Sequence, residues 1–347
     1  MKLSLHIGTP KSGTTTIQRF LQQNRDLLQA NGVCVPTSAG VSNQRRLAAM
    51  FLDDDVVDDF FRRLNLQDRE KRLAAKRQWR TDLSAEIAAQ PCSHVVMSSE
   101  HLQSRLQNPE GIRALARYLR EHFSDIHIIL YIRDPLDTLV SLYSSAVKSG
   151  STLAQLPLPL PPLWTNIADH RATIRRWQEN FSPDALRLRL FQKDDFLHGD
   201  LLSDFIAAAD LPELDYARPE RANESLDRLG LELLRRLNTD IPVILPDGTT
   251  NPLRGNIKTM FETHFNSGAP FRPNAEAVAA YDAAFADSNE WVRQTFFPDR
   301  AQLFTPKTRT VATKEELTSA DLDEMAAFAA ALWRRDGRRD ARKKNRA

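Results

Sequence analysis

Cysteines and long hydrophobic runs are scarce in this sequence. It has two cysteines among 347 residues, and no stretch approaches the ~20 consecutive apolar residues that a membrane span needs. Cys34 and Cys92 lack the close spacing of metal-binding motifs and argue against a disulfide scaffold. The N-terminus has no charged segment followed by a long apolar one, the pattern of a secretory leader. From these absences we expect a cytoplasmic protein.

An excess of either charge is also missing, because the formal net charge is only +2. The body of the chain is therefore not basic enough to predict a nucleic-acid-binding domain. Positive charge gathers in residues 334–347, which hold eight basic and two acidic residues. We expect residues 1–333 to form a single domain. We expect residues 334–347 to be a disordered tail that makes at most a weak contact with an anionic membrane surface.

The most informative segment is residues 5–21, LHIGTPKSGTTTIQRFL. An apolar run ends at Gly8, a loop of small residues follows, and an amphipathic helix begins near Thr14. This order of strand, loop and helix is typical of a phosphate site. Gly8 and Gly13 have the spacing of the Walker A pattern, but Thr14 stands where that pattern has its lysine. We therefore expect the loop to bind a phosphate other than the β- and γ-phosphates of ATP.

The loop has several groups that can bind an anion. Its backbone N–H groups converge, the first helical turn adds the positive end of its dipole, and Lys11 adds a mobile charge. Hydroxyl groups come from Ser12, Thr14, Thr15 and Thr16. The alternative is a capped helix that binds nothing, but a cap needs one hydroxyl rather than four with a lysine and two glycines.

A second candidate site lies in residues 126–143, IHIILYIRDPLDTLVSLY. The apolar run from Ile126 to Ile132 predicts a strand buried on both faces of a parallel sheet. Arg133 follows at the carboxyl end of that strand, where open α/β sheets bind ligands. A helix then begins near Pro135, and Ser141 lies eight residues after Arg133, about two helical turns away.

The segment from Pro10 to Thr15 resembles the 5′-phosphosulfate loop of sulfotransferases that use 3′-phosphoadenosine 5′-phosphosulfate (PAPS). The resemblance implies that Lys11 touches the sulfonate and the bridging oxygen. It also implies that the 5′-phosphate is held by the residues that follow, Ser12, Gly13, Thr14, Thr15 and Thr16. The second segment resembles the family's 3′-phosphate site, which implies that Arg133 and Ser141 hold that phosphate. We therefore expect PAPS as the donor and PAP as the product.

The resemblance also offers a catalytic base. Glu100 and His101 follow a short buried strand predicted at residues 94–98. Cytosolic sulfotransferases use a histidine after a comparable strand, and several carbohydrate sulfotransferases use a glutamate. We favour Glu100 as the base and His101 as its orienting neighbour, because Ser-Ser-Glu at a strand end resembles bacterial members. The alternative is that the pair only caps the next helix.

Two further segments bear on the same family. Residues 221–225, RANES, resemble the Asn-x-Ser segment of bacterial sulfotransferases, although a helix cap explains them equally well. The glycine-rich closing motif of cytosolic members is not evident, which argues against the small-phenol and steroid branch. We expect a small-molecule or glycan acceptor, above all the hydroxyl of a carbohydrate or glycolipid, and no metal.

The rest of the chain predicts an α/β fold. Strands alternate with helices, which implies a parallel sheet covered on both faces. The resemblance specifies a three-layer sheet of the P-loop NTPase type, with helical insertions around the acceptor cleft. Patterns of apolar residues predict a strand at 186–191 and helices at 14–30, 109–123, 201–209, 226–237, 274–295 and 318–335.

Two other functions fit parts of the sequence. A nucleotide or small-molecule kinase would also have a strand, loop and helix of this kind, but it would need a lysine at position 14. A non-catalytic protein that binds PAP or PAPS would keep Lys11 and have an inert Glu100 and His101.

Overall fold

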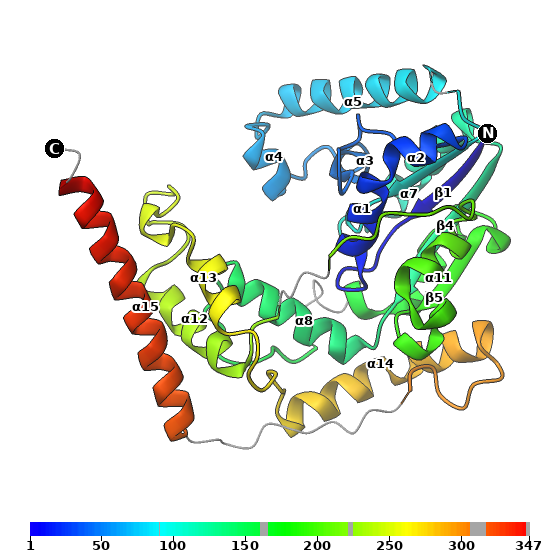
Figure 1. Ribbon diagram of the computed structural model, residues 1–347. Helices are drawn as coiled ribbons and strands as arrows, with labels where there is room; N and C mark the ends of the chain where they lie inside the picture. The colour runs from blue at the N-terminus through cyan, green and yellow to red at the C-terminus, as the bar shows by residue number, and fades with distance from the viewer. Residues whose placement is uncertain (90, 160–165, 221–224, 306–316, 345–347) are drawn as a thin grey trace. The chain divides into compact units, whose positions relative to one another are not determined.

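A parallel five-stranded sheet organises the first part of the chain, in the order β2-β3-β1-β4-β5 (Figure 1). The computed structural model describes residues 1–89, 91–159, 166–220, 225–305 and 317–344. The strands are β1 (Lys2–His6), β2 (Val33–Cys34), β3 (His94–Ser98), β4 (Asp125–Ile132) and β5 (Leu186–Leu190). β1 lies at the centre and pairs in parallel with β3 on one side and β4 on the other.

The helices connect these strands and then continue alone in the last third of the chain. They are α1 (Thr14–Gln23), α2 (Arg25–Ala30), α3 (Arg45–Ala49), α4 (Asp59–Arg63), α5 (Arg69–Ala89), α6 (His101–Ser104), α7 (Pro109–His122), α8 (Pro135–Lys148), α10 (His170–Gln178), α11 (Leu201–Ala208), α12 (Arg228–Asp240), α13 (Ile257–His264), α14 (Ala275–Phe296) and α15 (Ser319–Lys344). None of the described helices is both long and apolar enough to cross a membrane.

Both faces of the sheet are covered, because alternate residues of each strand point to opposite sides. Leu3, Leu5 and Ile7 of the β1 segment pack in one core with residues of α3, α5, α7 and α10. Ile129 and Tyr131 of β4 pack in the other core with residues of α1 and α11. The prediction of an α/β fold with a parallel sheet covered by helices on both faces is confirmed.

Contacts divide the chain into two compact units. The first comprises Met1–Leu139, Leu158–Arg221 and Ala280–Lys307, and contains the whole sheet. The second comprises Val140–Pro157, Ala222–Ala279 and Thr308–Ala347. Within it, Phe328 of α15 packs against Phe261 and Phe265, with ring centroids 4.7 and 4.9 Å away. The single domain over residues 1–333 stays a prediction.

The helix predicted at residues 14–30 is interrupted at one residue. α1 ends at Gln23 and α2 begins at Arg25, with Asn24 between them. The buried side chain of Asn24 donates to the carbonyl of Ala217 and accepts from its N–H, each at 2.8 Å. The two bonded residues are 193 positions apart in the sequence. The residues around Asn24 therefore did not indicate these bonds.

The last helix also differs from its predicted bounds. α15 continues to Lys344, whereas apolar periodicity predicted an end near residue 335. Five of the nine residues from 336 to 344 are arginine or lysine, and both residue types favour helix. The boundary proposed at residue 334 therefore lies inside a helix, and the disorder of the tail stays a prediction.

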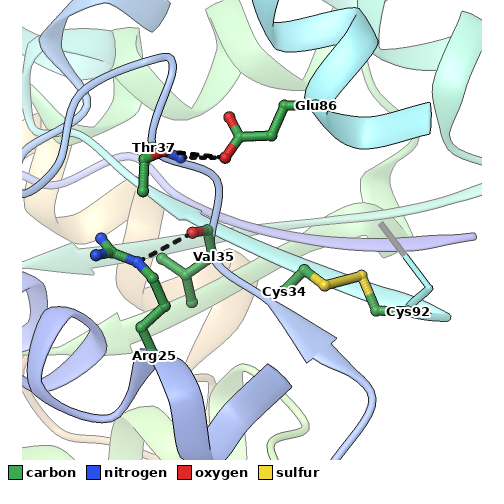
Figure 2. Close-up of a disulfide and its surroundings, with 6 residues drawn as sticks. All are labelled: Arg25, Cys34, Val35, Thr37, Glu86 and Cys92. Atoms are coloured by element: carbon green, nitrogen blue, oxygen red, sulfur yellow. Dashed lines mark hydrogen bonds between the residues drawn. A yellow bond between two sulfur atoms is a disulfide. The ribbon is translucent and has the colours of Figure 1, made fainter. Parts of the chain in front are cut away.

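The two cysteines form a disulfide, which the sequence argued against as a scaffold (Figure 2). Cys34 lies on β2 and pairs in register with Val95 of β3, while Cys92 lies just before β3. The adjacent strands bring the two Cα atoms to 6.0 Å, within the normal range for a disulfide. The pairing could not be read from a spacing of 58 residues, because it depends on which strands become neighbours.

Two hydrogen-bonded side chains hold the segment that follows Cys34 (Figure 2). Glu86 of α5 accepts from the N–H of Thr37 at 2.8 Å and from its hydroxyl at 3.0 Å. Arg25 of α2 donates to the carbonyl of Val35 at 3.3 Å. The disulfide therefore reinforces an edge strand that helices on either side already hold in place.

We predict that the double variant Cys34→Ala/Cys92→Ala loses about 2–4 kcal/mol of unfolding free energy, the usual effect of a disulfide that closes a long loop. Urea unfolding followed by circular dichroism measures the loss. Reductant is the matched control, because it should destabilise the wild type and leave the double variant unchanged. Equal unfolding free energies for oxidised and reduced wild type would contradict the prediction.

A second prediction concerns two buried histidines of the sheet. Burial lowers the pKa of His6 to about 3 and that of His94 to about 4. The unfolded chain binds these protons near pH 6.5, so the histidines contribute stability that is complete above that pH and is lost as pH falls toward 4. Each should lower the unfolding free energy by about 1.4 kcal/mol per pH unit in that window.

The variant His6→Asn tests this dependence. Asparagine retains a polar group that can reach the Ser98 hydroxyl, which lies 2.8 Å from Nδ1 of His6. We expect a shallower slope between pH 6 and 5 in the variant, and equal slopes of wild type and variant above pH 7.5. Equal slopes throughout would mean that His6 is protonated in the folded protein.

Candidate functional site

The candidate site lies at the carboxyl ends of three adjacent strands. The loop after β1, the residues after β3 and the residues after β4 meet there, because β1 pairs with both neighbours. Parallel strands bring their carboxyl ends to one edge of the sheet, where ligands bind in open α/β folds. The sequence placed its candidate residues after these same three strands.

Backbone hydrogen bonds hold the start of the loop. The Tyr131 N–H donates to the Gly8 carbonyl at 2.9 Å, and the Thr9 N–H donates to the Tyr131 carbonyl at 3.0 Å. The Thr9 hydroxyl donates to the same carbonyl at 3.1 Å. The pairing of β1 with β4 thus continues three residues beyond β1, as far as Thr9, and the loop leaves the sheet from a fixed point.

The N-terminus of α1 is open to an anion. No side chain caps it, and no acidic residue occupies its first turn. Gly13 precedes the helix in the left-handed region, with φ +77°, which glycine adopts at little cost. A Cβ at Gly13 would lie 2.3 Å from a methyl carbon of Leu201. The N–H groups of the first turn and the helix dipole therefore point at a site where a phosphate is stabilised.

The side chains of the loop differ in exposure. Lys11 is half-buried and has φ +67°. Ser12 is fully buried and its hydroxyl donates to the Thr9 carbonyl at 2.6 Å, so this group supports the loop. Thr14 is buried, Thr16 half-buried and Thr15 exposed. Among the predicted phosphate ligands, Ser12 is therefore the one whose hydroxyl is hydrogen-bonded to the backbone of the loop itself.

Arg133 lies against the loop. Its guanidinium donates to the Lys11 carbonyl at 2.9 Å and lies 5.6 Å from the centre of the Phe191 ring. Burial lowers its pKa below the usual 12.5, yet an arginine in a protein keeps its charge. The Arg133 guanidinium and the open helix N-terminus both favour an anion at the end of β4, while the carboxylates of Asp134 and Asp137 partly offset the charge of Arg133.

His170 supports Arg133 and was missed by the sequence analysis. This buried histidine of α10 lies 2.8 Å from the Arg133 carbonyl through Nε2, which must therefore carry the proton and donate it. Burial lowers the pKa of His170 to about 4, so the ring is neutral at physiological pH. It fixes the turn between β4 and α8. No local pattern around residue 170 could have revealed this contact across 37 residues.

Glu100 packs directly on the loop. A Cβ placed at Gly8 would make a tight contact, 3.2 Å from the Cα of Glu100, and the φ of +111° at Gly8 also favours glycine. Gln18 of α1 donates to Glu100 Oε2 at 2.6 Å. The sequence analysis also missed Gln18. Its place between the core residues Ile17 and Leu21 was a signal, because a buried glutamine needs a polar partner.

His101 lies beside Glu100, with Nε2 at 3.7 Å from Glu100 Oε1. Burial lowers the pKa of His101 below 6.5, although the carboxylate of Glu100 acts in the opposite direction. His101 is therefore mostly neutral at pH 7. The structure thus brings Lys11, Glu100, His101 and Arg133 to one edge of the sheet.

Two predicted elements of the site are not tested by this geometry. Ser141 lies on α8 in the second compact unit, and its contact with the 3′-phosphate stays a prediction. Four of the five residues of the Asn-x-Ser segment at 221–225 lie outside the described residues. Among the residues that the structure does describe, no cluster of three His, Cys, Asp or Glu could hold a metal ion.

Among solved structures, a sulfotransferase from Alicyclobacillus acidocaldarius is similar, with 16% identity, a TM-score of 0.39 and coverage of 82% of this chain and 95% of that chain. A sulfotransferase domain from the curacin biosynthetic pathway shows 10% identity, a TM-score of 0.31 and coverage of 62% and 75%. No curated protein matches the sequence.

The assignment of the family rests on the sequence match alone. The model of the sulfotransferase family matches residues 5–197, which is more than half of the chain. The match includes the phosphate loop, Glu100 and Arg133, the three elements that meet at the sheet edge. This chain therefore belongs to the sulfotransferase family.

Proposed function

We propose that the protein transfers a sulfonate group from PAPS to a hydroxyl group of an acceptor. The observation that carries this proposal is the meeting of an open helix N-terminus, a half-buried lysine, a desolvated arginine and a carboxylate at one sheet edge. The first three suit the phosphates and the developing charge of a doubly phosphorylated donor. The carboxylate suits an acceptor that must lose a proton.

Each residue then has a separate task. The N–H groups of the first turn of α1 and the hydroxyls of Thr14, Thr15 and Thr16 bind the 5′-phosphate. Lys11 binds the sulfonate and the bridging oxygen, where negative charge grows as the bond to sulfur breaks. Arg133 and Ser141 bind the 3′-phosphate, which would be held by the planar fork of the guanidinium.

Glu100 is the base in this proposal. It takes the proton of the acceptor hydroxyl as the oxygen attacks sulfur, and PAP leaves with the electron pair of the broken bond. The contact of Glu100 with Gly8 supports this role, because it keeps the carboxylate beside the loop that holds the sulfonate. His101 is its neutral neighbour and helps to orient it.

The acceptor and the location are further parts of the proposal. A carbohydrate or glycolipid hydroxyl is the favoured acceptor. We keep the cytoplasm as the proposed compartment, although the Cys34–Cys92 disulfide is of a kind rare in reducing compartments. The basic segment from residue 334 is proposed to make weak contact with anionic membrane surfaces and not to bind nucleic acid.

We predict that PAP and PAPS raise the melting temperature of the protein, whereas ADP and ATP with Mg²⁺ do so much less. The reason is that the loop has Thr14 in place of the lysine that holds the β- and γ-phosphates. Thermal-shift screening with the four nucleotides measures the difference. Stabilisation by ATP with Mg²⁺ but not by PAP would favour a kinase.

We predict that Arg133→Ala weakens PAP binding by about 1–3 kcal/mol, the loss of a charged hydrogen-bonding partner. Isothermal titration calorimetry measures the change. Arg113→Ala, which removes an exposed arginine of α7, is the matched control and should bind PAP like the wild type. Unchanged PAP affinity in the Arg133 variant would show that this residue does not bind the nucleotide.

We predict that Lys11→Ala lowers transfer from PAPS by about 10²-fold or more, because a group that stabilises the transition-state charge is lost. The assay follows PAP release with a panel of sugar, glycolipid and phenol acceptors. Lys193→Ala, at an exposed lysine, is the control. Tight PAP binding without turnover on any acceptor would instead indicate a non-catalytic binding protein.

Glu100→Gln and His101→Ala separate the base from its neighbour. At saturating PAPS, Glu100→Gln should lower kcat by about 10²–10⁴-fold, the usual contribution of a general base. His101→Ala should lower it much less, and neither variant should weaken PAP binding. A larger loss in His101→Ala than in Glu100→Gln would reverse the two roles.

A further inference from the structure

The second compact unit contains a cavity that the proposed function does not use. It has a volume of about 590 Å³, within the range of small-molecule sites. Its walls come from α12, from residues 269–272 and from Leu317 and Met325. All of its lining residues belong to the second unit, so the cavity can be described without reference to the phosphate loop.

Carbon atoms dominate much of this lining. α12 contributes Leu229, Leu231 and Leu233 to the lining, and α15 contributes Met325. Tyr143 packs against Phe271 with ring centroids 5.0 Å apart. The Tyr143 hydroxyl already donates to the Leu153 carbonyl at 2.8 Å, so its ring meets a ligand mainly as an apolar surface.

Among the charged side chains of the lining, Arg272 lies apart from the carboxylates that pair with the other arginines. The lining holds three arginines, Arg228, Arg236 and Arg272, and one carboxylate, Glu232. Arg228 is paired with Asp321, whose carboxylate lies 3.1 Å from its guanidinium. Glu232 accepts from Arg235 and from Arg236 at 2.6–2.9 Å, so it is neutralised by its own helix. Among the described residues, no carboxylate lies within 4.0 Å of Arg272, which is exposed. An anionic head group at this position would be attracted rather than repelled.

We propose that this cavity binds a lipophilic monoanion, a molecule with an apolar chain or ring and one acidic head group. The apolar part lies between the leucines of α12 and the Tyr143–Phe271 pair, and the head group lies next to Arg272. The proposal is independent of the sulfotransferase reaction, because it uses no residue of the phosphate loop, Glu100 or Arg133.

The test uses decanoate as the probe with the full-length protein, below its micelle threshold, in a calorimetric titration. Decanol and decyltrimethylammonium have the same chain with no charge and with the opposite charge. We expect decanoate to bind best and decyltrimethylammonium worst. Octanoate should bind about tenfold more weakly than decanoate, because it buries two fewer methylene groups.

Two variants locate the binding. Arg272→Ala should weaken decanoate about fivefold and leave decanol unchanged, as expected for a partly exposed charge contact. Ala269→Trp adds bulk at an exposed lining position and should weaken all three probes. Arg113→Ala, in the first unit, is the matched control and should bind every probe like the wild type.

Three results would overturn the proposal. These are equal binding of the three ten-carbon probes, unchanged decanoate binding in both variants, and binding only above the micelle threshold. PAP titrated into the same variants separates this site from the donor site. PAP affinity should not change in Arg272→Ala, so a failure of the donor assignment leaves the decanoate result interpretable.

Discussion

Three backbone hydrogen bonds between the end of β1 and β4 fix the rest of the site. They join Ile7 to Ile129, Gly8 to Tyr131 and Tyr131 to Thr9. Because Tyr131 is held in this way, Arg133 emerges two residues later beside the Lys11 carbonyl. On the other side of β1, the Ser99 N–H donates to the His6 carbonyl at 2.9 Å, and Glu100 follows. The parallel pairing of one central strand thus positions the cation and the carboxylate at once.

Packing outside the sheet makes this arrangement rigid. His170 holds the turn after β4 through the Arg133 carbonyl, and Gln18 holds Glu100 from the helix that starts at the loop. Both side chains are buried, where a hydrogen bond is hard to exchange for one with water. Groups that bind an anion are most effective when they need no rearrangement. Gln18 and His170 come from helices on opposite faces of the sheet and hold these groups from both sides.

The sequence predicted the parts of the fold that depend on local patterns. Apolar runs at residues 94–98 and 126–132 became β3 and β4, because a strand buried on both faces must be apolar throughout. The loop, Glu100 and Arg133 could be found because they follow such strands directly. Gln18, His170 and the break at Asn24 could not be predicted, since each depends on a partner far along the chain. The Cys34–Cys92 disulfide could not be predicted for the same reason, because its two cysteines are 58 residues apart.

The close approach at Gly8 limits how this enzyme can vary. A side chain at position 8 would meet the backbone of Glu100 at 3.2 Å, and φ at that residue is +111°. Any replacement of Gly8 would have to shift Glu100 and the loop together. Laboratory evolution toward new acceptors should therefore leave residue 8 fixed and diversify positions further from the loop, where a change in shape does not displace Glu100 or the start of α1.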